Sequence, residues 1–542
     1  MGLLEWFKSL FWKSESEKNL TTQNIDETVG TRQCCGKADQ APSMLSPENP
    51  PSDGIEQESP DLLRKIPAED QEFYSLEEVD RKITEKIQPS EKRIQITPKT
   101  SREIKVWVGI DFGTSFTKLA YRVLGSTGKV LPLDLRSNQQ MPYAIPSLVA
   151  FDDGRILFGN EADRFLKGRP WYEGARYLKI LFAGEIDKAF LDEEMRKHFD
   201  RYCANQQIDQ AMLKPGYLVA AFLAHTLREV KIHLGRTFGN EPLINFNVCI
   251  PIDTYEKKDV KAGFQRAINV AEVIEKRWSG QRAIELLENA ASIWERTTDS
   301  ETMGSRIHLV PEAVAQMACY VSSLAAEKKI HGVIDFGAGT TDFSIFNLCE
   351  LEEKGTCAYW YNAVTFPGGM TKIEDRIATW SRQQGREMDY YQLQSAMENI
   401  SSRESEIQEI VRYELQKIWE ESRYPAWGKA YSLRRKESDW HSQNVKIFVC
   451  GGGSRIPYVK RIFRQCWYTP DWGPYEVSAL TAPFDFGGNP KDFPRLAVAY
   501  GLTIPRPALA EYVLPKDCPD QTPPMPPRYR PDPTGPVYDD YH

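Results

Sequence analysis

The pattern of hydrophobic and polar positions divides the chain into three parts. Residues 14 to about 103 are polar and rich in Glu, Lys, Ser, Gln and Pro, and residues 506–542 are rich in proline. Nearly all of the periodic apolar pattern lies in residues 104–505, so only this middle part is expected to pack around a hydrophobic core. The flanking parts bury too little apolar surface to offset the entropy of ordering them, which predicts disordered N- and C-terminal extensions.

The first residues of the chain differ from the polar segment that follows them. Residues 1–13 are predicted to form an amphipathic helix, because apolar side chains recur there at helical spacing. Such a helix could lie on a membrane surface through residues 3–12, fit a groove on a partner, or dock on the core of its own chain. The adjacent Cys34 and Cys35 could carry an acyl group as a second anchor.

Two segments of the middle part share one pattern. Residues 109–117 read GIDFGTSFT and residues 333–341 read VIDFGAGTT, so that Ile, Asp, Phe, Gly and Thr recur in register. Each copy follows one apolar run and precedes another, which predicts a strand, a tight turn and a second strand. Two matched hairpins indicate a duplicated fold.

The small residues of these turns indicate a phosphate site. They allow successive backbone N–H groups to point into one concavity, which suits phosphate oxygens. Asp111 and Asp335 end the first strand of each hairpin and would face the same place. A carboxylate beside a phosphate is unfavourable unless a divalent cation lies between them. Two hairpins that face each other are therefore expected to bind a Mg-nucleotide, although a single DxG turn would be common in hairpins.

A third glycine cluster follows the apolar strand predicted at 447–450. It consists of Gly451 to Gly453 and leads into a helix expected near Pro457. Glycines at this place would let the backbone approach a flat base or a ribose. Turns of this kind also serve many other purposes, so the cluster is only moderately specific by itself.

Taken together, residues 104–505 resemble the actin-like ATPase superfamily, and most closely the nucleotide-binding domain of the heat shock protein 70 chaperones. Further segments occur in the order found in that family, namely IPSLVAF at 145–151, NVCIP at 247–251, LVPEAVA at 309–315, FPGG at 366–369 and AVAYG at 497–501. The resemblance implies an α/β fold of the duplicated, ribonuclease H-like, two-lobed kind. Its boundaries would be lobe I at about 104–330, lobe II at about 331–490 and a closing helix at about 491–505.

The resemblance also implies which residues form the site. Asp111 and Asp335 would hold hydrated Mg²⁺ between the lobes with support from Asp342, and Glu312 would position the attacking water together with Asp335. The residues implied to contact the phosphates or the adenosine of ATP or ADP are Gly113, Thr114, Ser115, Phe116, Gly337, Gly339, Thr340, Thr341, Gly368, Gly369, Gly451, Gly452, Gly453, Ser454 and Arg455.

Some positions depart from the family pattern. The chaperones place a catalytic lysine in the segment that matches residues 174–179, and the matching position is interpreted as Arg176, which keeps the charge but changes the reach. Lys118 could compensate, because it is the register counterpart of Asp342 in the other hairpin; a lysine that faces outward from its strand is the alternative. The residues that grip adenine in the chaperones have no clear counterpart in residues 410–422.

The expected function is a slowly hydrolysing switch that converts ATP to ADP and phosphate and whose lobes open and close on Mg-nucleotide to control a partner. The alternatives are a nucleotide-binding scaffold that has lost turnover and an actin-like filament former. The chain ends about 40 residues after Gly501, too few for the peptide-binding β-sandwich of the chaperones, so an ordinary foldase is not expected. No sugar-binding motif favours a sugar kinase.

Composition argues against several other classes. With 68 basic and 76 acidic side chains the net charge is -8, so no global positive field points to nucleic acid. The ten cysteines contain no CxxC, which argues against a zinc site or a dense disulfide framework and favours a reducing, cytoplasmic location. The seven histidines form no triad or metal-spaced motif. No apolar run is long enough to predict a transmembrane helix, so any membrane association would depend on the N-terminal helix.

Two further segments have open roles. Residues 523–529 contain both a PxxPxR and a PPxY pattern, which suit an SH3 or WW domain partner, and a solvated tail is the alternative. Residues 279–303 are interpreted as an insertion, and helical periodicity is present at Ile284, Leu287, Ala291 and Trp294. The role of this insertion and the oligomeric state are not predicted.

Overall fold

The computed structural model describes residues 103–518, with gaps at 127, 136–142, 170–172, 240, 279–282, 301–304, 352–354, 400–404, 434–444 and 466–474. The chain divides into two units, residues 1–96 and 97–542, and every described residue lies in the second unit. The predictions for the N-terminal helix, for Cys34 and Cys35, and for the proline motif at 523–529 therefore fall outside the described residues.

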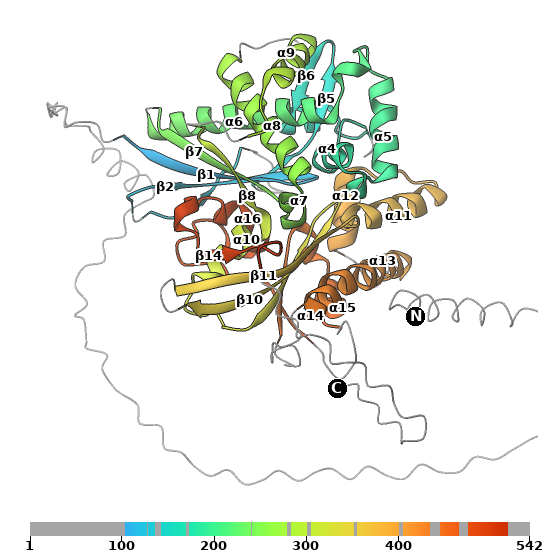
Figure 1. Cartoon of the computed structure of the whole chain (residues 1–542). Coiled ribbons are helices and arrows are strands. Elements are labelled where there is room, and N and C mark those ends of the chain that lie inside the picture. Colours follow the sequence, from blue (N-terminus) through green and yellow to red (C-terminus); the bar gives the residue numbers. More distant parts are fainter. Residues whose placement is uncertain are drawn as a thin grey trace, which may run out of the picture. The chain divides into compact units, whose positions relative to one another are not determined.

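The described part is an α/β fold with two mixed six-stranded sheets (Figure 1). The first sheet has the order β3-β2-β1-β7-β8, with β4 paired to β2; its strands are β1 Lys105–Phe112, β2 Phe116–Val123, β3 Leu131–Pro132, β4 Ala144–Pro146, β7 Leu243–Ile250 and β8 Ile307–Pro311. The second sheet has the order β13-β12-β9-β10-β11-β14; its strands are β9 Ile330–Phe336, β10 Thr341–Leu351, β11 Gly355–Phe366, β12 Lys446–Cys450, β13 Glu476–Ser478 and β14 Glu511–Val513. A separate hairpin is formed by β5 Val149–Asp152 and β6 Arg155–Phe158.

Four consecutive strands have the same arrangement in the two sheets. Strand β1 is antiparallel to β2 and parallel to β7, which is parallel to β8. In the second sheet β9 is antiparallel to β10 and parallel to β12, which is parallel to β13. The register pairs Asp111 with Lys118 and Asp335 with Asp342. The two hairpins predicted from the repeated sequence are therefore present and occupy equivalent places.

Helices cover the sheets and connect their strands. Their bounds are α3 Gly159–Phe165, α4 Leu178–Ile186, α5 Glu193–Ala204, α6 Pro215–Phe238, α7 Ile252–Glu256, α8 Lys258–Arg277, α9 Ala283–Arg296, α10 Glu312–Val321, α11 Met370–Gln383, α12 Tyr390–Glu398, α13 Ser405–Arg423, α14 Lys429–Leu433, α15 Val459–Phe463 and α16 Phe493–Gly501. Helix α6 illustrates the local signals, because proline occupies its first position and Gly239 ends it with φ 69°.

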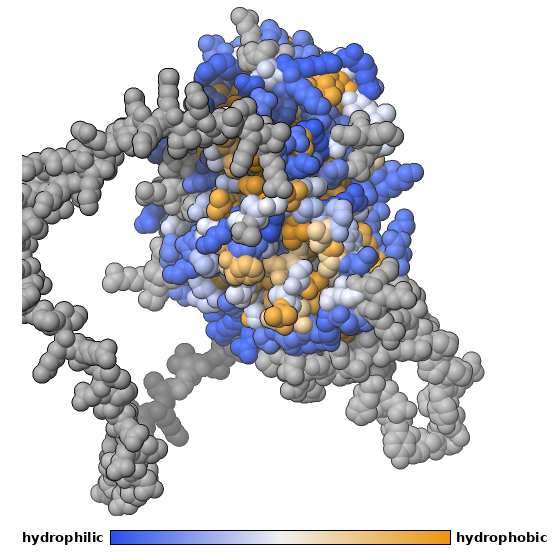
Figure 2. Space-filling view, turned by 90° about the vertical axis from the view of Figure 1, so that its left-hand side faces the viewer, coloured by the Kyte–Doolittle hydropathy of each residue, from blue (hydrophilic) through white to orange (hydrophobic). Residues whose placement is uncertain are grey.

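Aromatic side chains fix these helices on the sheets. The rings of Phe112 in β1 and Phe222 in α6 lie 5.7 Å apart, and Phe343 in β10 stacks on Trp419 in α13 with ring centroids 5.7 Å apart. On the face shown in Figure 2, hydrophilic residues dominate the rim and hydrophobic residues show in the middle, on the side where strands of both sheets end in Figure 1. The buried apolar residues of the two sheets are nevertheless continuous, because one large cluster includes Val108 of β1 and Ile334 of β9.

Helices α10 and α16 pack on each other and contact strands of both sheets (Figure 1). Their backbones approach so closely that a Cβ atom at Gly501 would lie 1.8 Å from the carbonyl oxygen of Ala315. A Cβ atom at Gly109 in β1 would lie 2.2 Å from the carbonyl oxygen of Ala499. Glycine is therefore required at both positions by space, and this pair of helices sets how the two sheets meet.

The structure corrects one boundary and supports another prediction. Residues 506–518 were expected in a disordered tail, but β14 pairs in parallel with β11, and Cys518 is buried. The proline-rich composition concealed Tyr512 and Val513, which are half-buried and give this segment surface to pack. In the insertion, α9 forms where helical periodicity predicted it.

None of the described helices has the length and hydropathy needed to cross a bilayer.

Replacement of Gly501 by alanine should destabilise the protein by at least about 2 kcal/mol, because the new methyl group would overlap the backbone of α10. Gly235 in α6 provides the control, since no atom lies within 4 Å of a Cβ placed there. Gly235→Ala should be neutral or stabilise by up to about 1 kcal/mol. Urea unfolding followed by circular dichroism measures both, and equal stability of the two variants would contradict the close packing.

Candidate functional site

The turns of both hairpins, the glycine turn after β12 and one side of α12 line a single cavity. Its lining residues are Asp111, Gly113, Thr114, Ser115, Phe116, Lys118, Lys179, Glu312, Asp335, Gly337, Ala338, Thr340, Asp342, Met370, Tyr390, Gln394, Glu398, Gly451, Gly452 and Arg495. Segments more than 300 residues apart in the sequence therefore meet at one place. Most of the residues implied by the family resemblance are among them.

The implied residues that do not line the cavity are Arg176, Gly339, Thr341, Gly368, Gly369, Gly453, Ser454 and Arg455. Several of them support the lining from behind. The Thr341 hydroxyl donates to the carbonyl oxygen of Gly368 at 2.6 Å, and a Cβ atom at Gly339 would lie 2.9 Å from the Thr114 side chain. The two hairpin turns thus approach each other at Gly339 and Thr114.

The first hairpin presents a carboxylate and an ammonium group side by side. Asp111 is 2% exposed, and Lys118 Nζ lies 2.7 Å from its Oδ2. The turn between the strands is held by Ser147, whose hydroxyl donates to the Gly113 carbonyl at 2.8 Å and whose amide donates to the Ser115 carbonyl at 2.9 Å. Lys118 therefore faces the cavity and does not point outward from its strand.

The second hairpin presents two carboxylates. Gln316 of α10 donates to Asp335 Oδ2 at 2.5 Å. The hydroxyls of Thr340 and Thr365 donate to the two oxygens of Asp342, at 3.0 and 2.7 Å. Each carboxylate is thus held in a fixed orientation by a neutral donor rather than by a cation.

The N-terminus of α11 supports the turn of the second hairpin. The amide of Met370 donates to the Gly337 carbonyl at 3.1 Å, and the amide of Thr371 donates to the Ala338 carbonyl at 2.9 Å. A Cβ atom at Gly369 would lie 2.5 Å from the carbonyl oxygen of Ala338. The glycine pair at 368 and 369 therefore acts by letting the helix approach the turn.

Lys179 is the site residue that the sequence reasoning missed. Its Nζ lies 2.9 Å from Glu312 Oε2, and both side chains are nearly buried. Arg176, which was assigned the position of the catalytic lysine, does not line the cavity. Its guanidinium lies 5.4 Å from the centroid of the Tyr390 ring, and its Nε donates to the Glu173 carbonyl at 3.2 Å. A signal was present, because Lys179 is a single charged residue within the otherwise buried start of α4.

The glycine turn after β12 lies against the second hairpin. Gly451 has φ +80°, and a Cβ atom there would lie 2.4 Å from Asp335 Oδ1. Residues Gly452–Arg455 form a short 3₁₀ helix, and the helix expected near Pro457 begins at Val459. Arg455 forms an ion pair with Asp492. Its guanidinium therefore has a partner outside the cavity.

The lining of the cavity has more acidic than basic side chains. Its lining has five carboxylates, from Asp111, Glu312, Asp335, Asp342 and Glu398, against three cations, from Lys118, Lys179 and Arg495. Burial away from water raises the pKa of Asp335 to about 8 and that of Asp342 to about 7. The negative charge of the nearby Glu312 makes the second-largest contribution to both shifts. Atoms of Asp111, Cys249 and Glu312 that could bind a metal lie within 4.8 Å of one another. The carboxylates of Asp111 and Glu312 each form an ion pair with a lysine. A divalent cation would relieve the repulsion between these groups.

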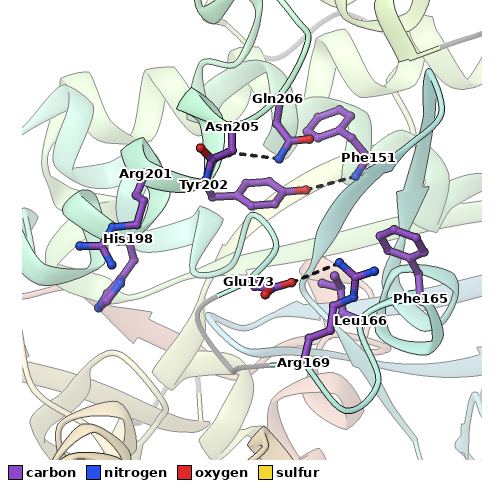
Figure 3. A pocket seen from close by; sticks show the side chains of 10 residues that line it. All are labelled: Phe151, Phe165, Leu166, Arg169, Glu173, His198, Arg201, Tyr202, Asn205 and Gln206. Carbon is purple, nitrogen blue, oxygen red and sulfur yellow. Dashed lines mark hydrogen bonds and ion pairs between the residues drawn. The ribbon is translucent and has the colours of Figure 1, made fainter.

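A second cavity lies between α5 and the β5–β6 hairpin (Figure 3). Its polar groups are largely bonded to one another. The Phe151 amide donates to the Tyr202 hydroxyl at 3.2 Å, and Arg169 lies 3.3 Å from a Glu173 oxygen. The first cavity, with its excess of buried carboxylates, is therefore the stronger candidate site.

No protein-family model and no curated protein sequence matches this chain. The fold and the cavity define an α/β protein with two equivalent hairpins that present carboxylates and small-residue turns to one site. The functional conclusion therefore depends on the chemistry of these residues.

Replacement of Lys179 by methionine should destabilise the protein by about 3 kcal/mol, because it leaves Glu312 nearly buried among other carboxylates without its cation. The double variant Lys179→Met/Glu312→Gln should recover much of this loss, since it removes both members of the pair. Chemical denaturation of the single and double variants measures the coupling. A double variant as unstable as the sum of its two single variants would show that the pair is not coupled.

Proposed function

We propose that the cavity binds Mg-ATP or Mg-ADP between two lobes of a duplicated, ribonuclease H-like fold, as in actin-like ATPases and the nucleotide-binding domain of heat shock protein 70 chaperones. The observation that carries this proposal is the pair of equivalent hairpins, whose register-matched Asp111 and Asp335 face one cavity. Small-residue turns that suit phosphate oxygens accompany both carboxylates. The equivalent arrangement of four consecutive strands in the two sheets supports the duplicated fold.

The residues of the cavity fit a hydrated magnesium ion. Mg²⁺ prefers oxygen ligands and keeps several of its waters when few carboxylates bind it. Asp111, Asp335 and Asp342 would hold it largely through water, and the excess of carboxylates over cations leaves room for two positive charges. When bound, the ion would neutralise charge on the phosphate oxygens.

The remaining groups would orient the reactants. Glu312, held by Lys179, would accept a hydrogen bond from the attacking water, and Asp335, held by Gln316, would fix the same water from the other side. The backbone N–H groups of the two turns would bind phosphate oxygens. Lys179 supplies a fixed positive charge near the transferred phosphoryl group, which stabilises the transition state.

Binding and hydrolysis of nucleotide at such a site would change the distance between the two sheets. Contacts between their halves already exist beside the cavity, where the Tyr391 hydroxyl donates to Asp163 at 2.7 Å and the rings of Phe116 and Tyr390 lie 5.6 Å apart. A nucleotide that touches both hairpins would favour the closed arrangement, and its hydrolysis would relax it. This is the behaviour of a slow switch that controls a partner protein.

The alternative of a scaffold without turnover depended on Arg176 as a replacement for a catalytic lysine. Lys179 beside Glu312 favours turnover instead. A single-turnover experiment with γ- and α-labelled ATP separates the two functions. The switch is expected to convert bound ATP slowly to ADP, whereas the scaffold would retain ATP unchanged. Assembly on ATP detected by light scattering would indicate the filament former.

Replacement of Asp335 by asparagine should abolish the magnesium-dependent thermal stabilisation by ATP and lower hydrolysis at least about 100-fold, because it removes a carboxylate that faces both metal and water. The stability of the nucleotide-free protein should not fall, since burial already favours the neutral form of this side chain. Differential scanning fluorimetry and phosphate release measure these effects.

The exposed Asp259 in α8 provides a matched control for the same substitution. Asp259→Asn should respond to Mg-ATP like the wild type. Wild-type turnover and nucleotide response in the Asp335→Asn variant would contradict the proposed site.

A further inference from the structure

Arg495 is the one cation of the cavity lining without an ionic partner among the described residues. It lies in the first turn of α16 and is 8% exposed. Lys118 and Lys179 lie 2.7 and 2.9 Å from carboxylates, whereas Arg495 forms no ion pair or hydrogen bond within the described part of the chain. Its guanidinium is therefore the cation that remains available to a ligand.

A buried cation without a partner is energetically costly. Withdrawal from water, together with the nearby charge of Arg455, lowers the pKa of Arg495 from its ordinary value. The backbone that carries this side chain is well fixed, because the Pro494 carbonyl accepts a hydrogen bond from the Gly451 amide at 3.3 Å and α16 packs against β1 and β2. The fold thus holds an unneutralised guanidinium beside the hairpin that carries Lys118.

The family resemblance placed a different arginine at the nucleotide. Arg455 was implied to flank the adenosine, but it is paired with Asp492 and does not line the cavity. A guanidinium offers a planar set of donors that matches the oxygens of a phosphate group. Arg495 has this chemistry and lies in the same cavity as the turn at 113–115. The charges of Glu398 and Asp492 act on it, but neither carboxylate forms an ion pair with it within the described part of the chain.

We propose that Arg495 binds the phosphate groups of the nucleotide, and that Arg495 rather than Arg455 is the arginine that contacts the nucleotide. The inference rests on the proposed function, which supplies the ligand, and it adds a residue that determines affinity for polyphosphate. Arg495 acts here as a binding residue and neutralises charge on the ligand.

The test uses the full chain and calorimetric titration with Mg-ATP, magnesium tripolyphosphate and adenosine. Arg495→Gln should weaken binding of Mg-ATP and tripolyphosphate roughly ten- to hundredfold, because a charged hydrogen bond is lost. Its affinity for adenosine should not change. Arg495→Lys should retain part of the phosphate affinity, since it keeps the charge but loses the planar donors.

Two controls separate binding from folding. Arg461→Gln removes an exposed arginine from α15 and should bind all three compounds like the wild type. Nucleotide-free Arg495→Gln should be at least as stable as the wild type in thermal unfolding, because an unpaired buried charge has been removed. A marked loss of stability would show that Arg495 has a structural role and would overturn the inference.

The outcomes distinguish this inference from the function on which it rests. Wild-type affinity of Arg495→Gln for Mg-ATP would overturn the role of Arg495 and leave the nucleotide site standing. An equal loss of adenosine binding would assign Arg495 to the base and also overturn the inference. Binding of tripolyphosphate that depends on Arg495, without binding of ATP, would support the inference and contradict the proposed function. Binding of neither compound by the wild type would overturn both.

Discussion

The repulsion among buried carboxylates at the meeting point of the two hairpins is the constraint on which the site depends. Asp111, Asp335 and Asp342 all line one small cavity together with Glu312. The surrounding groups are arranged to hold these charges: lysines neutralise two of them, and an amide and two hydroxyls orient the others. Desolvation still raises the pKa of both carboxyls in the second hairpin. Natural proteins retain such a destabilising cluster where function requires it, and a metal-bound polyphosphate would balance it.

The cluster exists only because backbones approach closely elsewhere. Glycines at 109 and 501 let β1, α10 and α16 come into direct contact, and Gly369 and Gly451 let a helix and a turn reach the second hairpin. These approaches bring together segments from opposite ends of the described chain. A single side chain at any of these positions would move one wall of the cavity. The close backbone packing therefore holds the carboxylate cluster in a fixed geometry, although the cluster itself lowers the stability of the fold.

Much of this arrangement could be predicted from the sequence, and the reasons are local. The repeated pattern at 109–117 and 333–341 predicted two hairpins, and the structure has both, with Lys118 and Asp342 at equivalent places in them. Lys179 was missed because Arg176 supplies a second cation only three residues earlier, and spacing could not tell which of the two enters the cavity. Arg495 was missed because its surroundings come from α12 and the turn at 451–452, which are remote in sequence. Strand β14 was missed because its pairing with β11 depends on a partner about 150 residues away, a contact that composition does not encode.

One cavity between the two sheets is proposed to bind a nucleotide through magnesium. Titration calorimetry of the unmodified full chain with ATP, in magnesium and again in EDTA, tests it most directly. We expect saturable binding in magnesium and an affinity at least about tenfold weaker in EDTA, because the carboxylates then repel the phosphates without a cation between them. Equal affinity under the two conditions, or no binding in magnesium, would contradict it.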